Sequence, residues 1–338
     1  SSTGWKPVLD TFDQGIQPTW LVETERGSYF EATANHKVRV LDSNGLNWRH
    51  VQDINSNDVL LTCPREFPDY KPVSNDMAYL LGAWHGDGVV RPYGIGFTGN
   101  RKELQVRDRI VKALQSEFSV PVSVHEFKTR PGSFDILLYG SEHKHRFEGL
   151  AGLRGMHLPQ ILNNASRETI CCFLRGLWDT DGYINNQYIC GIHMKSKVFL
   201  TELQDLLLGM GYDVTLTSNS TKLRGKVHTM WELKLRGRDM VHKFAQEIGF
   251  TESWKQSRLL STPVTQQGYT RYPVVSLYES LLRKYVPYNT HPMKPDDFRV
   301  SRMKKRGYVH SSSIDRLLYL VVDKDDPQVR EMQLIRSM

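Results

Sequence analysis

Residues 174–182 read LRGLWDTDG, and residues 81–88 read LGAWHGDG. Each pattern predicts an apolar helix that ends at Asp-Gly. In each helix two small residues stand four positions apart and share one face, which lets two backbones approach closely. If the helices pack through these faces, Asp87 and Asp181 lie side by side. Two crowded carboxylates in a basic protein favour a divalent cation between them.

The two stretches resemble the twin motifs of the LAGLIDADG homing endonucleases, also called the dodecapeptide family. The last acid of each motif is a metal ligand in that family, and Asp87 and Asp181 match it. The second copy matches better, with Asp179 at the earlier acidic position where the first copy has His85. The resemblance implies an α+β fold. Its pseudo-twofold endonuclease core has two αββαββα halves, and a small all-β region precedes that core here.

The composition favours a DNA-binding protein. The chain has 338 residues and a formal net charge of +7, with a pI of about 9.1, which is typical of a polyanion partner. No apolar run reaches membrane-spanning length, so no membrane partner is expected. The four cysteines fit no zinc spacing and are interpreted as reduced packing residues of an intracellular protein. Cytoplasm, nucleoid and organelle are not distinguished.

Three regions are expected along the chain. Residues 71–265 form a two-repeat endonuclease domain, with halves at about 71–160 and 161–265. Residues 1–70 form a β region similar to an intein (Hint) domain. Residues 266–338 form a basic, partly helical extension that is a candidate for extra DNA contacts.

Local signals mark the elements of the endonuclease domain. Ser74 or Asn75 is expected to cap the first motif helix, and Ser166 the second. Residues 89–98 and 183–194, which follow the two motifs, are each predicted to form a strand.

Residues 8–12, 20–24 and 29–33 predict short strands separated by turns. This arrangement resembles the N-terminal half of an intein splicing domain, in which Thr33 and His36 match the Thr-x-x-His motif that assists the first acyl shift. A plain β-hairpin is the alternative interpretation. The start, SSTGW, lacks the splicing nucleophile followed by a Gly-Asp strand, and the end, QLIRSM, lacks a cyclising asparagine. We therefore expect incomplete splicing chemistry in this chain as it stands, either because both ends are trimmed or because the splicing module has decayed.

The expected chemistry is hydrolysis of one phosphodiester in each DNA strand. Two or more Mg²⁺ ions at Asp87 and Asp181 would activate water and stabilise the leaving oxygen. The resemblance adds the backbone carbonyls of Gly86 and Thr180 as ligands. It also places a basic catalytic residue near each metal, late in each half, and Lys255 fits that role in the second half.

The first half has no lysine at the matching place. Arg154 and His157 are the candidates there, with plain surface residues as the alternative. His85 and Asp179 stand two residues before the paired aspartates and project from a different side of each helix. We interpret them as structural or minor contributors.

DNA recognition is expected from the strands, because a β-ribbon fits the major groove. Arginine and lysine would read guanine and bind phosphate, and asparagine and glutamine would read adenine. Since the two halves differ, the target should be a long, non-palindromic double-stranded DNA. The candidate DNA-binding residues are Arg91, Tyr93, Lys128 and Arg130 in the first half, and Asn185, Gln187, His193, Lys195, Lys222, Arg224, Lys226, Lys234 and Arg236 in the second.

The leading functional prediction is a Mg²⁺-dependent, site-specific homing endonuclease of the intein-encoded type, acting as a monomer with internal pseudo-twofold symmetry. One alternative is a protein-splicing element with a passive nuclease domain. Another is a non-cleaving DNA- or RNA-binding protein, such as an intron maturase. The presence of both aspartates argues against a pure binder, which does not need them.

Overall fold

The structure is a computed structural model, and it describes residues 7–62, 65–126, 132–223, 226–263, 271–286 and 300–337. These residues form two compact units. The first unit contains residues 24–28 and the described residues from 65 to 263. The second contains residues 7–23, residues 29–62 and the described residues from 271 onward. The predicted domain limits of 1–70, 71–265 and 266–338 remain a prediction.

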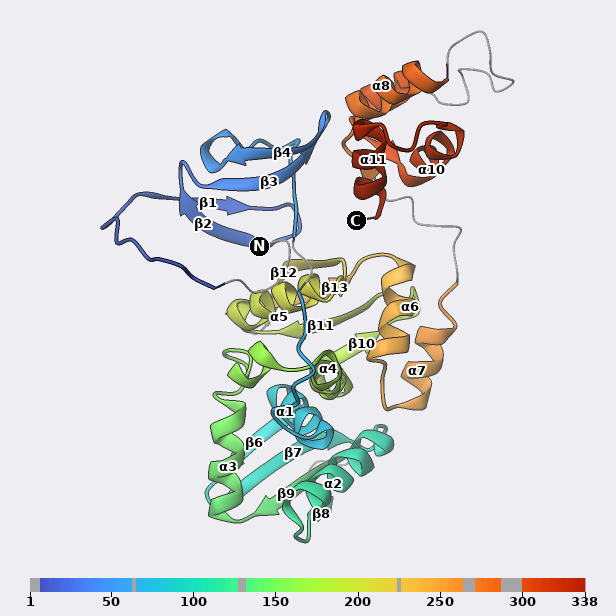
Figure 1. The fold of residues 1–338 in the computed structure, drawn as a ribbon. Helices are drawn as coiled ribbons and strands as arrows, with labels where there is room; N and C mark the ends of the chain where they lie inside the picture. Colours follow the sequence, from blue (N-terminus) through green and yellow to red (C-terminus); the bar gives the residue numbers. More distant parts are fainter. Residues whose placement is uncertain are drawn as a thin grey trace. The chain divides into compact units, whose positions relative to one another are not determined.

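The first unit contains two series of elements in the same order (Figure 1). The first series is α1 (Asn75–Asp87), β6 (Gly88–Arg91), β7 (Gly94–Asn100), α2 (Leu104–Phe118), β8 (Ser123–Glu126), β9 (Ser133–Tyr139) and α3 (Ser141–Ala151). After η2 (Gln160–Asn164), the second series is α4 (Arg167–Asp181), β10 (Gly182–Ile184), β11 (Cys190–Met194), α5 (Lys197–Gly209), β12 (Val214–Leu223), β13 (Lys226–Leu235) and α6 (Arg238–Glu247), and it is followed by α7 (Ser253–Leu260). The α+β class is confirmed, and a pseudo-twofold relation between the series remains a prediction.

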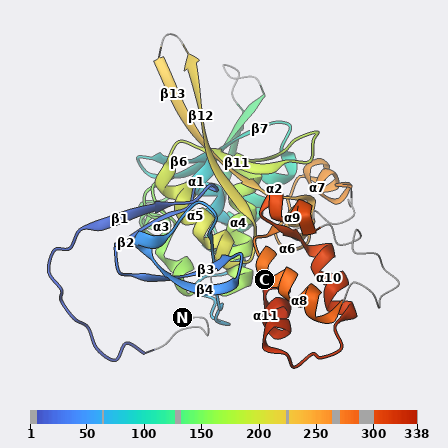
Figure 2. The same cartoon turned by 90° about the horizontal axis from the view of Figure 1, so that it is seen from above.

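Each series contributes one antiparallel sheet of four strands. The strand orders are β6-β7-β9-β8 and β10-β11-β13-β12, so the sheets share one topology. The β12–β13 hairpin continues beyond β11, whose pairing with β13 ends at Met194 and Trp231. Figure 2 shows this long hairpin from above.

Helices α1 and α4 pack against each other between the two sheets (Figure 1). A Cβ atom added at Gly82 would lie 1.9 Å from the backbone oxygen of Phe173, and one added at Gly176 would lie 2.0 Å from that of Tyr79. Only glycine therefore permits this approach. The predicted caps are present: the hydroxyl groups of Ser74 and Ser166 accept backbone N–H bonds in the first turns of α1 and α4.

The second unit combines N-terminal strands with C-terminal helices. Strand β1 (Thr19–Glu23) pairs with β2 (Tyr29–Thr33), and β3 (Lys37–Asp42) lies between β4 (Gly45–His50) and β5 (Val59–Leu60), with η1 (Val51–Asp53) between β4 and β5 in sequence. The C-terminal elements are β14 (Arg271–Tyr272), α8 (Val275–Tyr285), α9 (Val300–Arg306), β15 (Val309–His310), α10 (Ser311–Leu320) and α11 (Pro327–Ser337). Leu41 of β3 shares a buried core with these helices.

Thr33 and His36 lie at the turn between β2 and β3. The backbone N–H of His36 donates to the carbonyl oxygen of Thr33 at 3.0 Å, and the Thr33 hydroxyl donates to Asn35 Oδ1 at 2.9 Å. These are the local hydrogen bonds of a hairpin turn. The resemblance to a splicing domain remains a prediction.

Three strand predictions were wrong in detail. Residues 8–12 form no strand, and Leu9 is 94% exposed, because its apolar pattern has no pairing partner there. Residues 183–194 form two strands rather than one, and 89–98 likewise fall into β6 and β7. In the described part of the chain, no helix is both long and apolar enough to cross a membrane.

Candidate active site

The last turns of α1 and α4 bring Asp87 and Asp181 together. A Cβ atom added at Gly86 would lie 2.1 Å from the Thr180 hydroxyl oxygen and 3.3 Å from the carboxyl carbon of Asp181. Both helices end in the same way, with the next glycine donating its backbone N–H to the carbonyl oxygen of a tryptophan four residues earlier. The paired carboxylates are therefore a consequence of the glycine-mediated helix packing.

Both aspartates are half-buried, and burial is the main cause that raises the pKa of each carboxyl group. For Asp181 the pKa rises from 3.8 to about 6, with the charge of Asp87 as the second cause. The positive charge of Arg154 opposes both shifts, and that of Lys255 opposes the shift of Asp87. Two carboxyl groups that disfavour ionisation together form a site that a cation would stabilise.

Lys255 of α7 extends toward this pair. Its side chain is buried, and its Nζ donates to Glu103 Oε1 at 3.2 Å and to the carbonyl oxygen of Gly182 at 3.4 Å. Gly182 directly follows Asp181. The predicted catalytic lysine thus lies next to the end of the second motif, and its charge also acts on Asp87. Glu103, which the sequence interpretation missed, is its ion-pair partner.

A reciprocal cap holds α7 against α2. Glu252 is buried, and its Oε1 accepts the backbone N–H groups of Gln105 and Val106 at 2.8 and 3.1 Å, in the first turn of α2. Gln105 in turn accepts the backbone N–H and the hydroxyl of Ser253 at 2.7 and 2.9 Å, in the first turn of α7. Each helix start is satisfied by a side chain from the other. This arrangement fixes Lys255, from the second series, beside Asp87 of the first.

Asp179 and His85 each bind the segment that follows a helix, after α6 for Asp179 and after α3 for His85. Asp179 is fully buried and accepts hydrogen bonds at 2.8 Å from the Tyr79 hydroxyl and from the backbone N–H of Thr251, which follows α6. His85 Nδ1 accepts the backbone N–H of Gly155, which follows α3, at 3.0 Å. Burial lowers the pKa of His85 to about 4, so its ring is neutral at pH 7. Both side chains position the segment that carries the basic residue of their half.

Of the two first-half candidates, Arg154 is the one placed near the aspartates. It is exposed, and its charge lowers the pKa of both Asp87 and Asp181. His157 instead contacts Glu202 through Nδ1 at 2.6 Å.

The donors at the paired aspartates suit Mg²⁺. That ion prefers one or two carboxylates and completes its shell with waters and phosphate oxygens. Gly86 and Thr180 belong to the last four residues of their helices, whose carbonyl groups lack the regular helical partner. The Thr180 hydroxyl is engaged with the carbonyl oxygens of Gly176 and Leu177. No group of three or more His, Cys, Asp or Glu side chains that could hold a metal occurs among the described residues.

The outer face of the second sheet is organised around Glu232 of β13. Leu233 and Leu235 face the core, and Glu232 and Lys234 alternate with them. Tyr183 donates to Glu232 Oε1, and Lys234 Nζ lies 2.9 Å from its Oε2. Burial by itself raises the pKa of Glu232, but these hydrogen bonds outweigh it and lower the pKa. His193 Nε2 is 3.2 Å from the same carboxylate, and Asn219 Nδ2 donates to it at 3.3 Å.

The remaining DNA-binding candidates are less closely grouped. Arg91 Nη2 pairs with the buried Asp135 at 2.9 Å, and Tyr93 is 75% exposed between β6 and β7. Asn185 accepts backbone N–H bonds within the β10–β11 turn. Gln187, Lys195 and Arg236 are exposed just beyond strand ends. Outside the described residues lie Lys128, Arg130 and Arg224, together with the side chains of Lys222 and Lys226.

Solved structures similar to this chain include mesophilic variants of the homing endonuclease I-DmoI, with a TM-score of 0.40 and 18% identity over 52% of this chain and 94% of that chain. Full-length DUF199/WhiA from Thermatoga maritima has a TM-score of 0.38 and 14% identity over 78% of this chain and 91% of that chain.

The chain is also similar in sequence to parts of three proteins that are named as different enzymes. The chain is 25% identical over 274 residues to the replicative DNA helicase DnaB of Nostoc sp., which is 75% of this chain and 30% of that protein. It is 26% identical over 224 residues to the ribonucleoside-diphosphate reductase NrdEB subunit alpha of Bacillus subtilis (60% and 20%). It is 23% identical over 288 residues to the glutamine–fructose-6-phosphate aminotransferase of Methanocaldococcus jannaschii (80% and 25%). The chain thus spans less than a third of each relative.

One family model matches part of the chain. The matched residues are 168–249, and they run from the first turn of α4 to the residues just after α6. They include Asp181, one member of the aspartate pair, and Glu232 on the outer face of the sheet. Residues 168–249 of this chain are therefore similar to the LAGLIDADG-like domain family.

Proposed function

We propose that the protein is a site-specific DNA endonuclease that makes a metal-dependent double-strand break. The observation that carries this proposal is the pair of half-buried aspartates, one at the end of each of two glycine-packed helices. Burial disfavours both charges, so a purely structural role would be served better by neutral side chains. A carboxylate pair of this kind is favourable when a cation neutralises it.

Mg²⁺ fits these donors, with Asp87, Asp181 and the carbonyl groups of Gly86 and Thr180 as its protein ligands. When bound, two or more such ions would supply the activated water and the charge neutralisation that phosphodiester hydrolysis requires. The chain's own contribution is positioning. Lys255 supplies a fixed positive charge beside the motif ends, where negative charge develops on the phosphate.

The two half-sites differ in their basic group. Lys255 is buried and held by an ion pair, whereas Arg154 is exposed and its charge acts on both aspartates. A guanidinium group cannot release a proton, so Arg154 can stabilise charge but cannot transfer protons to water. The two strands of the target would therefore be cut at different rates.

The outer faces of the two sheets also differ, and this difference supports a long, non-palindromic double-stranded target. The first face presents Arg91 held by Asp135, and the second presents His193 and Lys234 held by Glu232. The protein would act as a monomer with internal pseudo-twofold symmetry, inside the cell, where its DNA target is.

The pattern of relatives supports an origin of the intein-encoded type. A helicase, a reductase and an aminotransferase share no activity by name, and each aligns with this chain over a fifth to a third of its length. An element that is inserted into unrelated host genes would produce this pattern.

The test is cleavage of a plasmid library that carries randomised target segments. In the presence of Mg²⁺ the protein should linearise a subset of plasmids, and sequencing the new ends should give one long asymmetric site. Asp87→Asn combined with Asp181→Asn should abolish cleavage and retain DNA binding. Asp205→Asn, which removes a carboxylate from α5 outside the site, is the matched control. Binding to a selected site without any Mg²⁺-dependent cut would instead establish a non-cleaving DNA-binding protein.

A further inference from the structure

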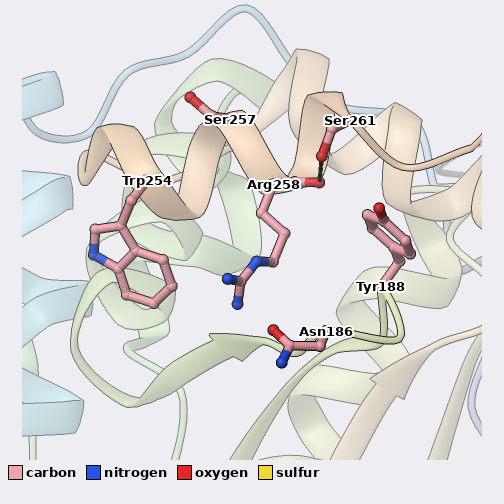
Figure 3. A pocket seen from close by; sticks show the side chains of 6 residues that line it. All are labelled: Asn186, Tyr188, Trp254, Ser257, Arg258 and Ser261. Atoms are coloured by element: carbon pink, nitrogen blue, oxygen red, sulfur yellow. Dashed lines mark hydrogen bonds between the residues drawn. The ribbon is translucent and has the colours of Figure 1, made fainter.

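A hollow of about 620 Å³ lies between α7 and the turn that joins β10 to β11 (Figure 3). Its volume falls within the roughly 300–1,000 Å³ of small-molecule sites. None of its lining side chains is acidic, so it suits an anionic or neutral ligand. The lining residues are Trp254, Ser257, Arg258 and Ser261 from the α7 segment, and Asn186 and Tyr188 from the turn.

Trp254 and Arg258 contribute two planar side-chain groups to one wall of this hollow. The indole of Trp254 is 48% exposed, although large aromatic side chains are normally well buried. The guanidinium carbon of Arg258 lies 5.4 Å from the indole centroid. Among the described residues, the guanidinium group donates one hydrogen bond, at 3.4 Å to the carbonyl oxygen of Ile184, so most of its N–H donors are available. A planar group and a phosphate are the ligands that such a pair recognises.

The facing turn is held in a constrained shape. Tyr188 has a φ of 62°, which non-glycine residues rarely adopt. The Asn185 side chain stabilises this conformation, because its Oδ1 accepts the backbone N–H groups of Gln187 and Ile189, both at 2.9 Å. Backbone strain of this kind is often found at ligand-binding sites. Figure 3 shows the Arg258 side chain extending between Trp254 and Tyr188, toward Asn186.

Lys255 connects Trp254, which lines the hollow, with the end of α4. The Nζ atom of Lys255 lies 5.8 Å from the Trp254 ring and 3.4 Å from the carbonyl oxygen of Gly182, the residue after Asp181. A strand whose phosphodiester lies at the aspartates would therefore pass close to Trp254.

We propose that this hollow receives one unpaired nucleotide of the DNA strand, with its base against Trp254 and Arg258 and its phosphate on the Arg258 guanidinium. The inference rests on the proposed function. A paired base cannot fill the hollow, because its faces are covered by its neighbours in the duplex. Stacking on an aromatic ring tolerates every base, so the hollow would hold a frayed or cut strand without reading its sequence.

The test compares two fluorescent duplexes of identical sequence, one blunt and one with a short single-stranded extension, by anisotropy without Mg²⁺. The wild-type protein should prefer the extended duplex. Trp254→Ala should weaken binding of that duplex by about 5- to 100-fold and leave the blunt duplex unchanged, and Arg258→Gln should act in the same direction. Trp48→Ala is the matched control, because Trp48 is 65% exposed and stacks with Arg39 at 5.5 Å but is not among the residues that line this hollow.

A spectroscopic signature separates stacking from a structural effect. A 2-aminopurine base at the first unpaired position should be quenched on binding, and Trp254→Ala should relieve the quenching. Equal wild-type affinity for both duplexes would overturn the proposal, as would an equal loss for both in Trp254→Ala. Displacement of the extended duplex by a micromolar deoxynucleoside monophosphate would assign the hollow to a free nucleotide instead. If the protein prefers the extended duplex but does not cleave DNA, the endonuclease proposal is wrong and the role of the hollow stands. If the protein cleaves DNA but shows no preference for the extended duplex, only the proposed role of the hollow is wrong.

Discussion

Alanine in place of Gly82 or Gly176 should destabilise the protein strongly, although alanine is the better helix former. The added Cβ atom at Gly82 would meet the backbone oxygen of Phe173 at 1.9 Å and the backbone nitrogen of Leu177 at 2.8 Å. Neither atom can move unless the whole helix moves. Ordinary carbon contacts lie near 3.5–4.0 Å, so α1 and α4 would have to separate by roughly 1.5 Å.

Two opposing effects determine how much each alanine variant changes the free energy of unfolding. Replacing a helical glycine with alanine gains about 1 kcal/mol of helix propensity. Overpacking a rigid contact costs about 1–3 kcal/mol or more, and backbone-to-backbone strain belongs at the upper end. We expect a net loss of about 2 kcal/mol in the free energy of unfolding for each variant, and DNA cleavage should also fall because the paired aspartates would separate.

Urea unfolding followed by circular dichroism is the assay, with Gly149→Ala as the matched control. Gly149 also lies inside a helix, α3, but an added Cβ atom there meets nothing within 4 Å. Its replacement should raise the free energy of unfolding by about 0.5–1 kcal/mol. If Gly82→Ala or Gly176→Ala is as stable as Gly149→Ala, the close helix packing described above is wrong.

Three further changes probe the site. The folded-state pKa of Asp181, about 6, exceeds its ordinary value of 3.8, so stability of the metal-free protein should fall as pH rises from about 4 to 6; thermal melts should show a larger loss in the wild type than in Asp181→Asn, where the raised pKa of Asp87 remains, and Mg²⁺ should offset it. Lys255→Met should slow cutting of one strand more than the other, so that nicked circles accumulate in a plasmid time course; equal slowing of both strands would argue against an asymmetric role. Glu252→Gln keeps the shape of the side chain but weakens the charge-assisted hydrogen bonds that cap α2. Cutting of the DNA strand near Lys255 should therefore slow by about tenfold while substrate affinity stays constant. An unchanged single-turnover rate would show that Glu252 does not position Lys255.

The sequence predicted the elements that local patterns define. The four-residue spacing of small residues located α1 and α4, and the serine caps Ser74 and Ser166 hold their starts. The bounds of β2 were also predicted as they stand in the structure. These features depend on residues close together in the chain, where periodicity and capping preferences are informative.

Features that depend on distant residues could not be predicted in this way. The reciprocal cap joins Glu252 to Gln105 across 147 positions, and no periodic signal marks either residue. Glu232 was missed because a carboxylate among basic residues contradicts the expected charge of a DNA-binding face. The division of 183–194 into two strands had a usable signal, since Asn185, Asn186 and Gln187 form a polar run that is typical of a turn.

We propose above all that Asp87 and Asp181 together hold the metal ion that is required for hydrolysis of DNA. The most direct test is Mn²⁺ binding to the protein–DNA complex, measured by electron paramagnetic resonance alongside cleavage of the selected site. Asp87→Asn and Asp181→Asn should each lose bound Mn²⁺ and double-strand cleavage together, while Asp205→Asn keeps both. Full Mn²⁺ binding and full cleavage in either motif variant would contradict the assignment.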